Sequence, residues 1–224
     1  MTESPGTSIR FFFDYVSPYA YLAWTRLPGL MRSHDVSVEP VPVLLAGLLK
    51  AHGSIGPAET PAKKRWMVEN VLQTAKQLDV PIRPPAFHPF NPLLALRVTA
   101  GLECEPRRLA VIDACFQAVW RDALHISDAR ILAEVLDELG IDSAAALKRA
   151  KTPAVKELLR QQTDDAIALG VFGVPTFILD GQLFWGVDEM ARIEARLRGD
   201  DLLDEDASRY WLEHVQSSAE RKRP

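Results

Sequence analysis

Residues 170–177, GVFGVPTF, place a Val-Pro step directly before a short β-prone run. A proline inside a central strand would remove a ladder hydrogen bond, so we expect Pro175 to open the strand. That position leaves the backbone N–H and C=O of Val174 unpaired, and a peptide-like ligand could pair with them. The alternative is an ordinary strand-initiating proline without a ligand.

The pair Ser17-Pro18 has the residue types of a helix start, with serine at the N-cap and proline at the first helical position. A hydroxyl at the positive end of a helix favours an anion or a thiolate. Residues 17–20, SPYA, carry no sulfur where a disulfide oxidoreductase has Cys-x-x-Cys, which excludes disulfide exchange by that route. The alternative for Ser17 is a plain helix cap.

Three other features have two interpretations each. Asp14 either orients Ser17 or is a turn residue that ends a strand. The basic run Lys63-Lys64-Arg65 either meets a substrate carboxylate or is a solvated helix start, and Trp120 is either a core residue or a platform for a ligand. The two cysteines, Cys104 and Cys115, form no metal-binding spacing, so we expect free thiols packed as small apolar groups.

The elements needed to position these residues follow a recognisable order. The pattern predicts strands at 9–13 and 36–42 around a helix from 18, which Pro28 should kink or end near Leu27. Asp180-Gly181 between apolar runs predicts a hairpin of strands 176–179 and 183–185, followed by a helix over 189–198. The segment between the two halves has helical periodicity, with expected helices at 62–78, 93–102, 107–120, 129–139, 143–150 and 153–169.

This order predicts an α/β protein with a thioredoxin-like fold and a large all-helical insertion domain. Residues 1–42 and 173–198 would form the discontinuous thioredoxin-like domain, residues 43–172 the insertion, and residues 199–224 a C-terminal helical tail. The net charge of −4 argues against a nucleic-acid partner, and no apolar run is long enough to span a membrane. The N-terminus lacks the pattern of a signal peptide, so we expect a cytoplasmic protein, and a homodimer is left open.

Several segments together resemble the 2-hydroxychromene-2-carboxylate isomerases and kappa-class glutathione transferases, within the DsbA-like branch of thioredoxin folds. The resemblance covers residues 9–198 in order, and its segments are FFDYVSPYAYLA at 12–23, GP at 56–57, HPFNP at 88–92, FQAVW at 116–120, VFGVPTF at 171–177 and FWGVD at 184–188.

The resemblance implies glutathione as cofactor and a small aromatic-derived substrate. It implies that Ser17 holds the glutathione sulfur and that Val174, beside a cis-Pro175, pairs with the cysteinyl backbone. Asp188 would hold the γ-glutamyl amine, with the Val187 backbone nearby, and Lys63 would meet a carboxylate. The implied reaction is thiolate addition to a conjugated carbon, bond rotation and elimination.

The sequence departs from the naphthalene-pathway isomerases near the expected substrate. Gly53-Ser54 stands where those enzymes have an asparagine after the glycine, and Trp66, Asn70 and Gln73 stand where they have tyrosine, aspartate and arginine. These departures concern the substrate more than the glutathione site. A kappa-like transferase and a non-catalytic glutathione-binding or interaction protein remain as alternatives.

Overall fold

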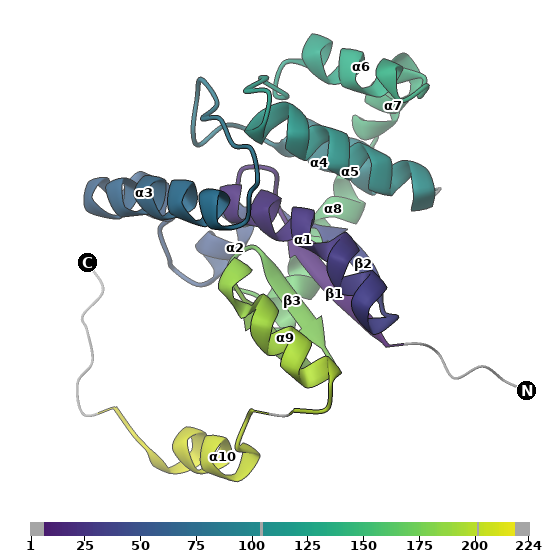
Figure 1. The fold of residues 1–224 in the computed structure, drawn as a ribbon. Helices are drawn as coiled ribbons and strands as arrows, with labels where there is room; N and C mark the ends of the chain where they lie inside the picture. Colours follow the sequence, from purple (N-terminus) through teal and green to yellow (C-terminus); the bar gives the residue numbers. More distant parts are fainter. Residues whose placement is uncertain (1–6, 104, 201, 218–224) are drawn as a thin grey trace, which may run out of the picture.

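The computed structural model describes residues 7–103, 105–200 and 202–217, and in that part of the chain it contains a four-stranded mixed sheet of order β2-β1-β3-β4 (Figure 1). The strands are β1 (Ser8–Phe13), β2 (Ser37–Pro42), β3 (Thr176–Leu179) and β4 (Gln182–Trp185). β1 pairs in parallel with β2 and antiparallel with β3. The prediction that the early and late strands share one sheet is therefore confirmed.

The Asp180-Gly181 turn joins β3 to its antiparallel partner β4, as the sequence predicts. Both residues have positive φ, 48° and 81°, the conformation that two-residue hairpin turns of this kind require. The α/β fold of thioredoxin type is borne out by this sheet and by the helices that surround it.

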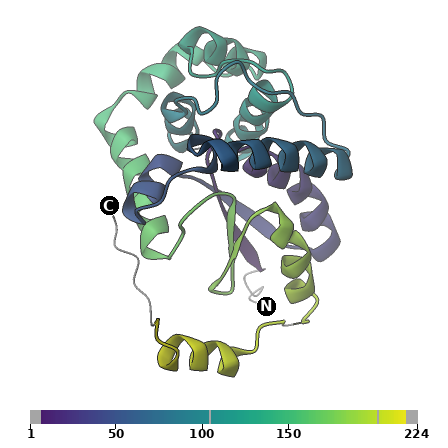
Figure 2. The ribbon, with the colours of Figure 1, turned by 90° about the vertical axis from the view of Figure 1, so that its left-hand side faces the viewer.

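Helices occupy most of the remaining described residues, and α4 to α7 gather at the end of the molecule opposite α9 and α10 (Figures 1 and 2). Their bounds are α1 (Pro18–His34), α2 (Leu45–Ala51), α3 (Pro61–Gln77), α4 (Leu93–Ala100), α5 (Glu105–Trp120), α6 (Ala129–Glu138), α7 (Ser143–Ala150), α8 (Pro153–Ala168), α9 (Met190–Leu197) and α10 (Glu205–His214), with short 3₁₀ turns at Pro57–Glu59 (η1) and Val187–Glu189 (η2).

The expectation that Pro28 kinks or ends the first helix near Leu27 is wrong, because α1 continues to His34. Proline lacks the N–H that would donate to the carbonyl four residues earlier, which is a local cost. Leu27 and Leu30, on either side of it, are only 2% and 4% exposed. Their burial keeps the helix intact through the proline.

The core divides at the sheet because β1 alternates its side chains between two faces. Phe11 and Phe13 stack at 5.6 Å and belong to the larger cluster, which also contains Phe116 of α5. Phe12 points to the other face and packs in a smaller cluster with residues of α2, α8 and the segment before β3. The strand that leads to Ser17 is thus buried on both sides.

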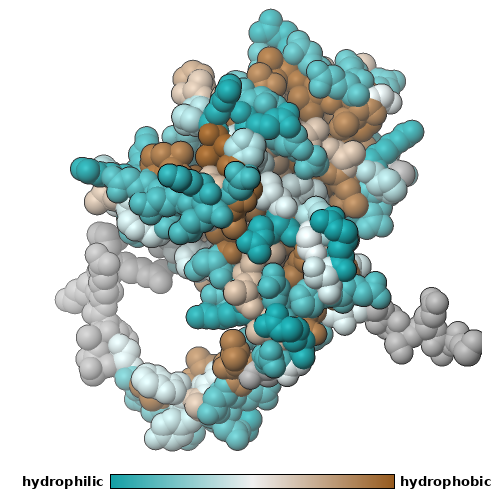
Figure 3. All heavy atoms as spheres, in the orientation of Figure 1, coloured by the Kyte–Doolittle hydropathy of each residue, from teal (hydrophilic) through white to brown (hydrophobic). Residues whose placement is uncertain are grey.

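α10 differs from the other α-helices in burying none of its residues. Tyr210 and Trp211 are 61% and 66% exposed, and hydrophobic residues show on the surface around α10 in the space-filling view (Figure 3). The sequence predicted a helical tail here, and α10 lies within that tail.

Candidate functional site

Ser17 joins the start of α1 to the turn before β3, two segments 157 residues apart. Its backbone is extended, with φ −93° and ψ 114°, and its Oγ caps the helix by accepting from Ala20 N at 3.2 Å. The same hydroxyl donates to the carbonyl oxygen of Val174 at 3.3 Å. The residue is 5% exposed. Ser17 is therefore a helix cap and also a contact to the Val-Pro turn.

The loop before Ser17 is built around the buried carboxylate of Asp14. Its two oxygens accept from Val16 N at 3.0 Å and from Leu45 N, in the first turn of α2, at 2.9 Å, while the Asp14 carbonyl accepts from Ser17 N. Burial raises the pKa of Asp14 to about 7, and the two amide hydrogen bonds oppose that rise. Asp14 does not contact the Ser17 hydroxyl; it fixes the loop that presents it.

Two backbone carbonyls of this loop accept hydrogen bonds from ring N–H groups of residues in the helical segment. Trp120 Nε1 donates to Tyr15 O at 2.9 Å, and His88 Nε2 lies 2.9 Å from Val16 O. A carbonyl only accepts, so His88 Nε2 carries the proton. Burial lowers the pKa of His88, which favours the neutral ring. Trp120 is 4% exposed and is a core residue, and the contact from His88 to this loop is one that sequence reasoning missed.

In the turn from Gly173 to Pro175, the backbone N–H groups of Gly173 and Val174 have no partner among the described residues. The Val174–Pro175 peptide bond is cis. Thr176 Oγ1 donates to Gly173 O at 2.7 Å, and Gly186 N donates to Pro175 O at 3.0 Å. Within the described residues the Val174 N–H has no partner, as expected, but the expectation of a free Val174 carbonyl is wrong, because Ser17 donates to it.

Asp188 lies in η2, directly after the β4 strand and a glycine with φ of 113°. A Cβ on Gly186 would lie 2.3 Å from Asp188 Oδ1, so any larger residue would force this carboxylate to move and would strain a backbone with positive φ. Asp188 also raises the pKa of Tyr19, which reaches about 12 mainly through burial. The structure thus brings Val174 and Pro175 to Ser17 at the N-terminal end of α1, and η2, which contains Val187 and Asp188, packs against α1 near Tyr19.

α3 packs against the N-terminal end of α1. Tyr19 Oη donates to Asn70 Oδ1 at 2.8 Å, so Asn70 has a structural role that the sequence did not indicate. Trp66 is 61% exposed and Gln73 is exposed. Lys63 is exposed, and among the described residues no ion pair or hydrogen bond ties it to the other candidate residues.

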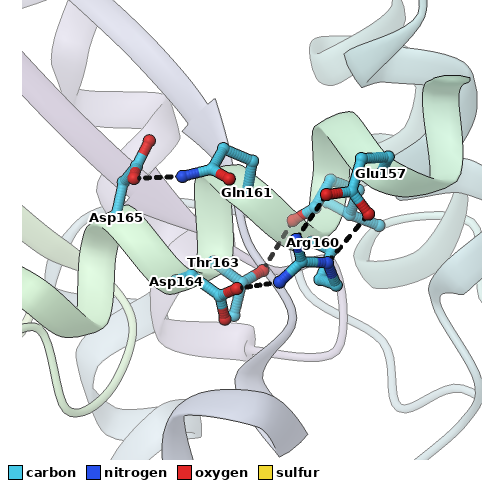
Figure 4. Close-up of polar contacts among 7 residues, drawn as sticks. Glu157, Arg160, Gln161, Thr163, Asp164 and Asp165 are labelled. Atoms are coloured by element: carbon cyan, nitrogen blue, oxygen red, sulfur yellow. Dashed lines mark hydrogen bonds and ion pairs between the residues drawn. The ribbon is translucent and has the colours of Figure 1, made fainter.

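α2 contacts both the loop before Ser17 and the segment before β3. Its N-terminal amide binds Asp14, while His52, just beyond its C-terminus, contacts Val171 O at 3.1 Å. Leu44 N, before α2, donates to Thr163 Oγ1 on α8 at 3.1 Å. Thr163 faces inward, and the outer side of α8 carries ion pairs from Arg160 to two carboxylates (Figure 4). The sequence did not single out α2, because its N-cap is a leucine with no capping side chain.

Residues 8–198 match the model of the DsbA-like thioredoxin domain, and the chain belongs to this family. The 2-hydroxychromene-2-carboxylate isomerase of Sphingobium xenophagum is 28% identical over 192 residues, which is 85% of this chain and 97% of that protein. Human glutathione S-transferase kappa 1 is 25% identical over 197 residues, 82% of this chain and 87% of the transferase.

A solved structure of a 2-hydroxychromene-2-carboxylate isomerase superposes on this fold with a TM-score of 0.80. It is 26% identical and covers 90% of this chain and 98% of its own. The sequence resemblance to this family is confirmed. Relatives in it are isomerases and glutathione transferases, which supports an enzyme rather than an inert scaffold.

Membrane spans and metal-ligand clusters are two further features to consider in the described part of the chain. No helix there is both long and apolar enough to cross a bilayer, and no three metal-binding side chains cluster. Cys115 is a free, fully buried thiol, and burial raises its pKa to about 12, whereas Cys104 lies outside the described residues.

Proposed function

We propose that this chain is a glutathione-dependent isomerase similar to the 2-hydroxychromene-2-carboxylate isomerases, acting on a small conjugated, aromatic-derived substrate. The observation that carries the proposal is the Ser17 hydroxyl at the start of α1, facing a Val-Pro turn whose N–H is free. The donor set fits a peptidyl thiol: a hydroxyl and a helix N-terminus for the sulfur, and a backbone edge for the peptide.

In this proposal Ser17 is the catalytic residue, because its hydroxyl donates to the sulfur. Val174 and Pro175 form the edge for the cysteinyl backbone, Asp188 with the Val187 backbone receives the γ-glutamyl amine, and Lys63 meets a carboxylate. Glutathione supplies the thiolate that adds to a conjugated carbon and leaves again.

The tasks of the protein are positioning and charge stabilisation. The N-terminus of α1 favours negative charge at the sulfur position. A hydrogen bond from a hydroxyl to a charged group contributes about 1.5–3 kcal/mol, which lowers the pKa of a thiol by about one to two units. The reference pKa of a thiol is about 8.5, so such a shift makes the thiolate abundant at neutral pH.

The test has two stages. A thermal-shift titration with glutathione should raise Tm, because a ligand at 100 times its Kd stabilises the folded state by about 2.7 kcal/mol. Absorbance assays with 2-hydroxychromene-2-carboxylate and with an electrophilic chloroarene then separate isomerase from transferase activity. Conjugation without isomerisation would favour a kappa-like transferase, and binding with neither activity would favour a non-catalytic glutathione-binding protein.

A further inference from the structure

Three consecutive carbonyls in the turn before β3 are satisfied in different ways. Gly173 O accepts from Thr176 Oγ1 and Pro175 O accepts from Gly186 N, and both donors belong to the frame of the turn. The carbonyl between them, Val174 O, receives its hydrogen bond from Ser17 at 3.3 Å, a long distance for a bond between two oxygens. The hydroxyl that donates to Val174 O is the same one that, in the proposed function, donates to the ligand sulfur.

A serine hydroxyl has one proton to donate and two lone pairs to accept with. Ser17 Oγ uses the proton on Val174 O and accepts from Ala20 N. Turning the proton toward a sulfur keeps the cap on α1 but leaves Val174 O without its donor. Val174 is 8% exposed, and a shielded carbonyl without a donor is unfavourable. A ligand group that donates to Val174 O in place of Ser17 therefore lowers the free energy needed to rotate the Ser17 hydroxyl toward the sulfur.

We propose that the Val174 carbonyl makes thiol activation conditional on an amide N–H from the ligand. A thiol carried by a residue whose backbone N–H reaches Val174 O releases the Ser17 hydroxyl for the sulfur, and a thiol without that N–H leaves it on Val174. The site is then selective for peptidyl thiols over simple thiols. This inference rests on the proposed function, because it assumes that the ligand thiol binds beside Ser17.

No covalent bond to the protein forms or breaks in this step. Ser17 keeps its proton and changes only the acceptor, from Val174 O to the thiolate. The thiol proton passes to solvent. The free Val174 N–H can pair with the ligand carbonyl of the same residue, which aligns the ligand whether or not the hydroxyl turns.

The experiment compares glutathione with its depsipeptide analogue, in which an ester oxygen replaces the cysteinyl N–H. The thiolate absorbance of each ligand is titrated against pH, free and bound to the full-length protein, and the shift on binding is the readout. We expect the shift to lower pKa to be about one unit larger for glutathione than for the analogue. In Ser17→Ala the two shifts should be equal, because the hydroxyl that couples the groups is gone.

Thr176→Val is the matched control, since it removes the donor to the neighbouring carbonyl, Gly173 O, and leaves Ser17 and Val174 unchanged. The difference between the two ligands should persist in it. If the analogue binds too weakly for saturation, the pH dependence of its Kd gives the same bound pKa.

Equal shifts for both ligands in the wild-type protein would overturn this inference and leave the proposed function standing. If bound glutathione titrates like free glutathione, both are wrong. A ligand difference that survives in Ser17→Ala would also overturn the inference, because it would then arise without the hydroxyl.

Discussion

Two regions flank Ser17 and are built by different means. The turn side, residues 173–188, offers mainly backbone groups to a ligand: the Val174 N–H is free, the carbonyls on either side of Val174 accept from Thr176 Oγ1 and Gly186 N, and Gly186 makes room for Asp188. The helix side, α3 with residues 84–92, presents exposed side chains, among them Trp66 at 61% and Phe87 at 64% exposed.

This difference explains what can be carried over from relatives that are 25–28% identical. Backbone N–H and C=O groups remain available when most side chains change, so the turn side supports the glutathione proposal. The helix side depends on individual side chains, and it holds the departures Trp66, Asn70 and Gln73. The substrate is therefore the less transferable part of the function.

The largest effect is expected at the residue that both regions share. Ser17→Ala should lower turnover by roughly 10- to 100-fold, because it removes the donor to the thiolate, while glutathione affinity changes less. Stopped-flow or steady-state kinetics with binding calorimetry measure both. Thr152→Ala is the control, because it removes the same kind of cap at the start of α8. In Thr152→Ala the free energy of unfolding should fall by about 1 kcal/mol, and turnover should be unchanged. Equal turnover losses would reduce Ser17 to a cap.

The second prediction disrupts the turn side alone. A Cβ in Gly186→Ala collides with Asp188 and strains a backbone at φ 113°, so glutathione affinity should fall by about tenfold and stability by roughly 1–3 kcal/mol. Gly181→Ala is matched, with φ 81° and nothing near its Cβ. It should lower stability by about 1–2 kcal/mol without changing affinity. Calorimetry and urea unfolding separate the two, and an affinity loss in both variants would contradict the role of Asp188.

The third prediction concerns the loop that serves both regions. Burial raises the folded-state pKa of Asp14 to about 7, above its unfolded value near 3.9, so folding favours the protonated carboxyl. Its contribution to stability is full below about pH 4 and is lost as pH rises to about 7, by an amount on the order of a few kcal/mol. Asp14→Asn should flatten the urea-unfolding free energy over that window.

Asp128→Asn serves as the control for this pH dependence. Arg130 holds the pKa of Asp128 below its usual value, so this group titrates below the window. The variant should keep the wild-type slope between pH 4 and pH 7. If Asp14→Asn also keeps that slope, the buried carboxyl is not its source.

The smallest effect is expected on the helix side. Trp66→Ala should change stability by less than about 0.5 kcal/mol, because the side chain is exposed. Glutathione affinity should stay the same, while the KM for the substrate should rise by roughly fivefold through loss of apolar contact. Trp211→Ala on α10 is matched, at 66% exposed, and should change neither. A weaker glutathione affinity in Trp66→Ala would mean that the two regions are not separate.

The sequence predicted the parts of the fold that have local signals. Ser17-Pro18 marks the start of α1 and Asp180-Gly181 the hairpin, because capping and turn chemistry involve only neighbouring residues. The predicted end of α1 near Pro28 was wrong, because burial of the leucines on either side of Pro28 outweighs the local helix-breaking effect of proline.

The remaining parts of the site depend on contacts between distant segments, and no local pattern encodes these. The contact of His88 with Val16 joins a proline-rich loop to the site, and the contact of His52 with Val171 depends on α2, a helix without a capping residue. The hydrogen bond from Ser17 to Val174 O was missed for another reason, because the sequence predicted that this carbonyl stays free for a ligand.

The order of the sheet has a consequence for synthesis on the ribosome. β1 is central, yet its partner β3 is made only after the long helical segment, which at 5–20 residues per second takes roughly 10–30 s. During that time one edge of β1 has no partner strand, and Phe12 lacks the α8 residues that later cover it. The nascent N-terminal segment therefore exposes an aromatic strand edge, which favours pairing with other chains until β3 is made.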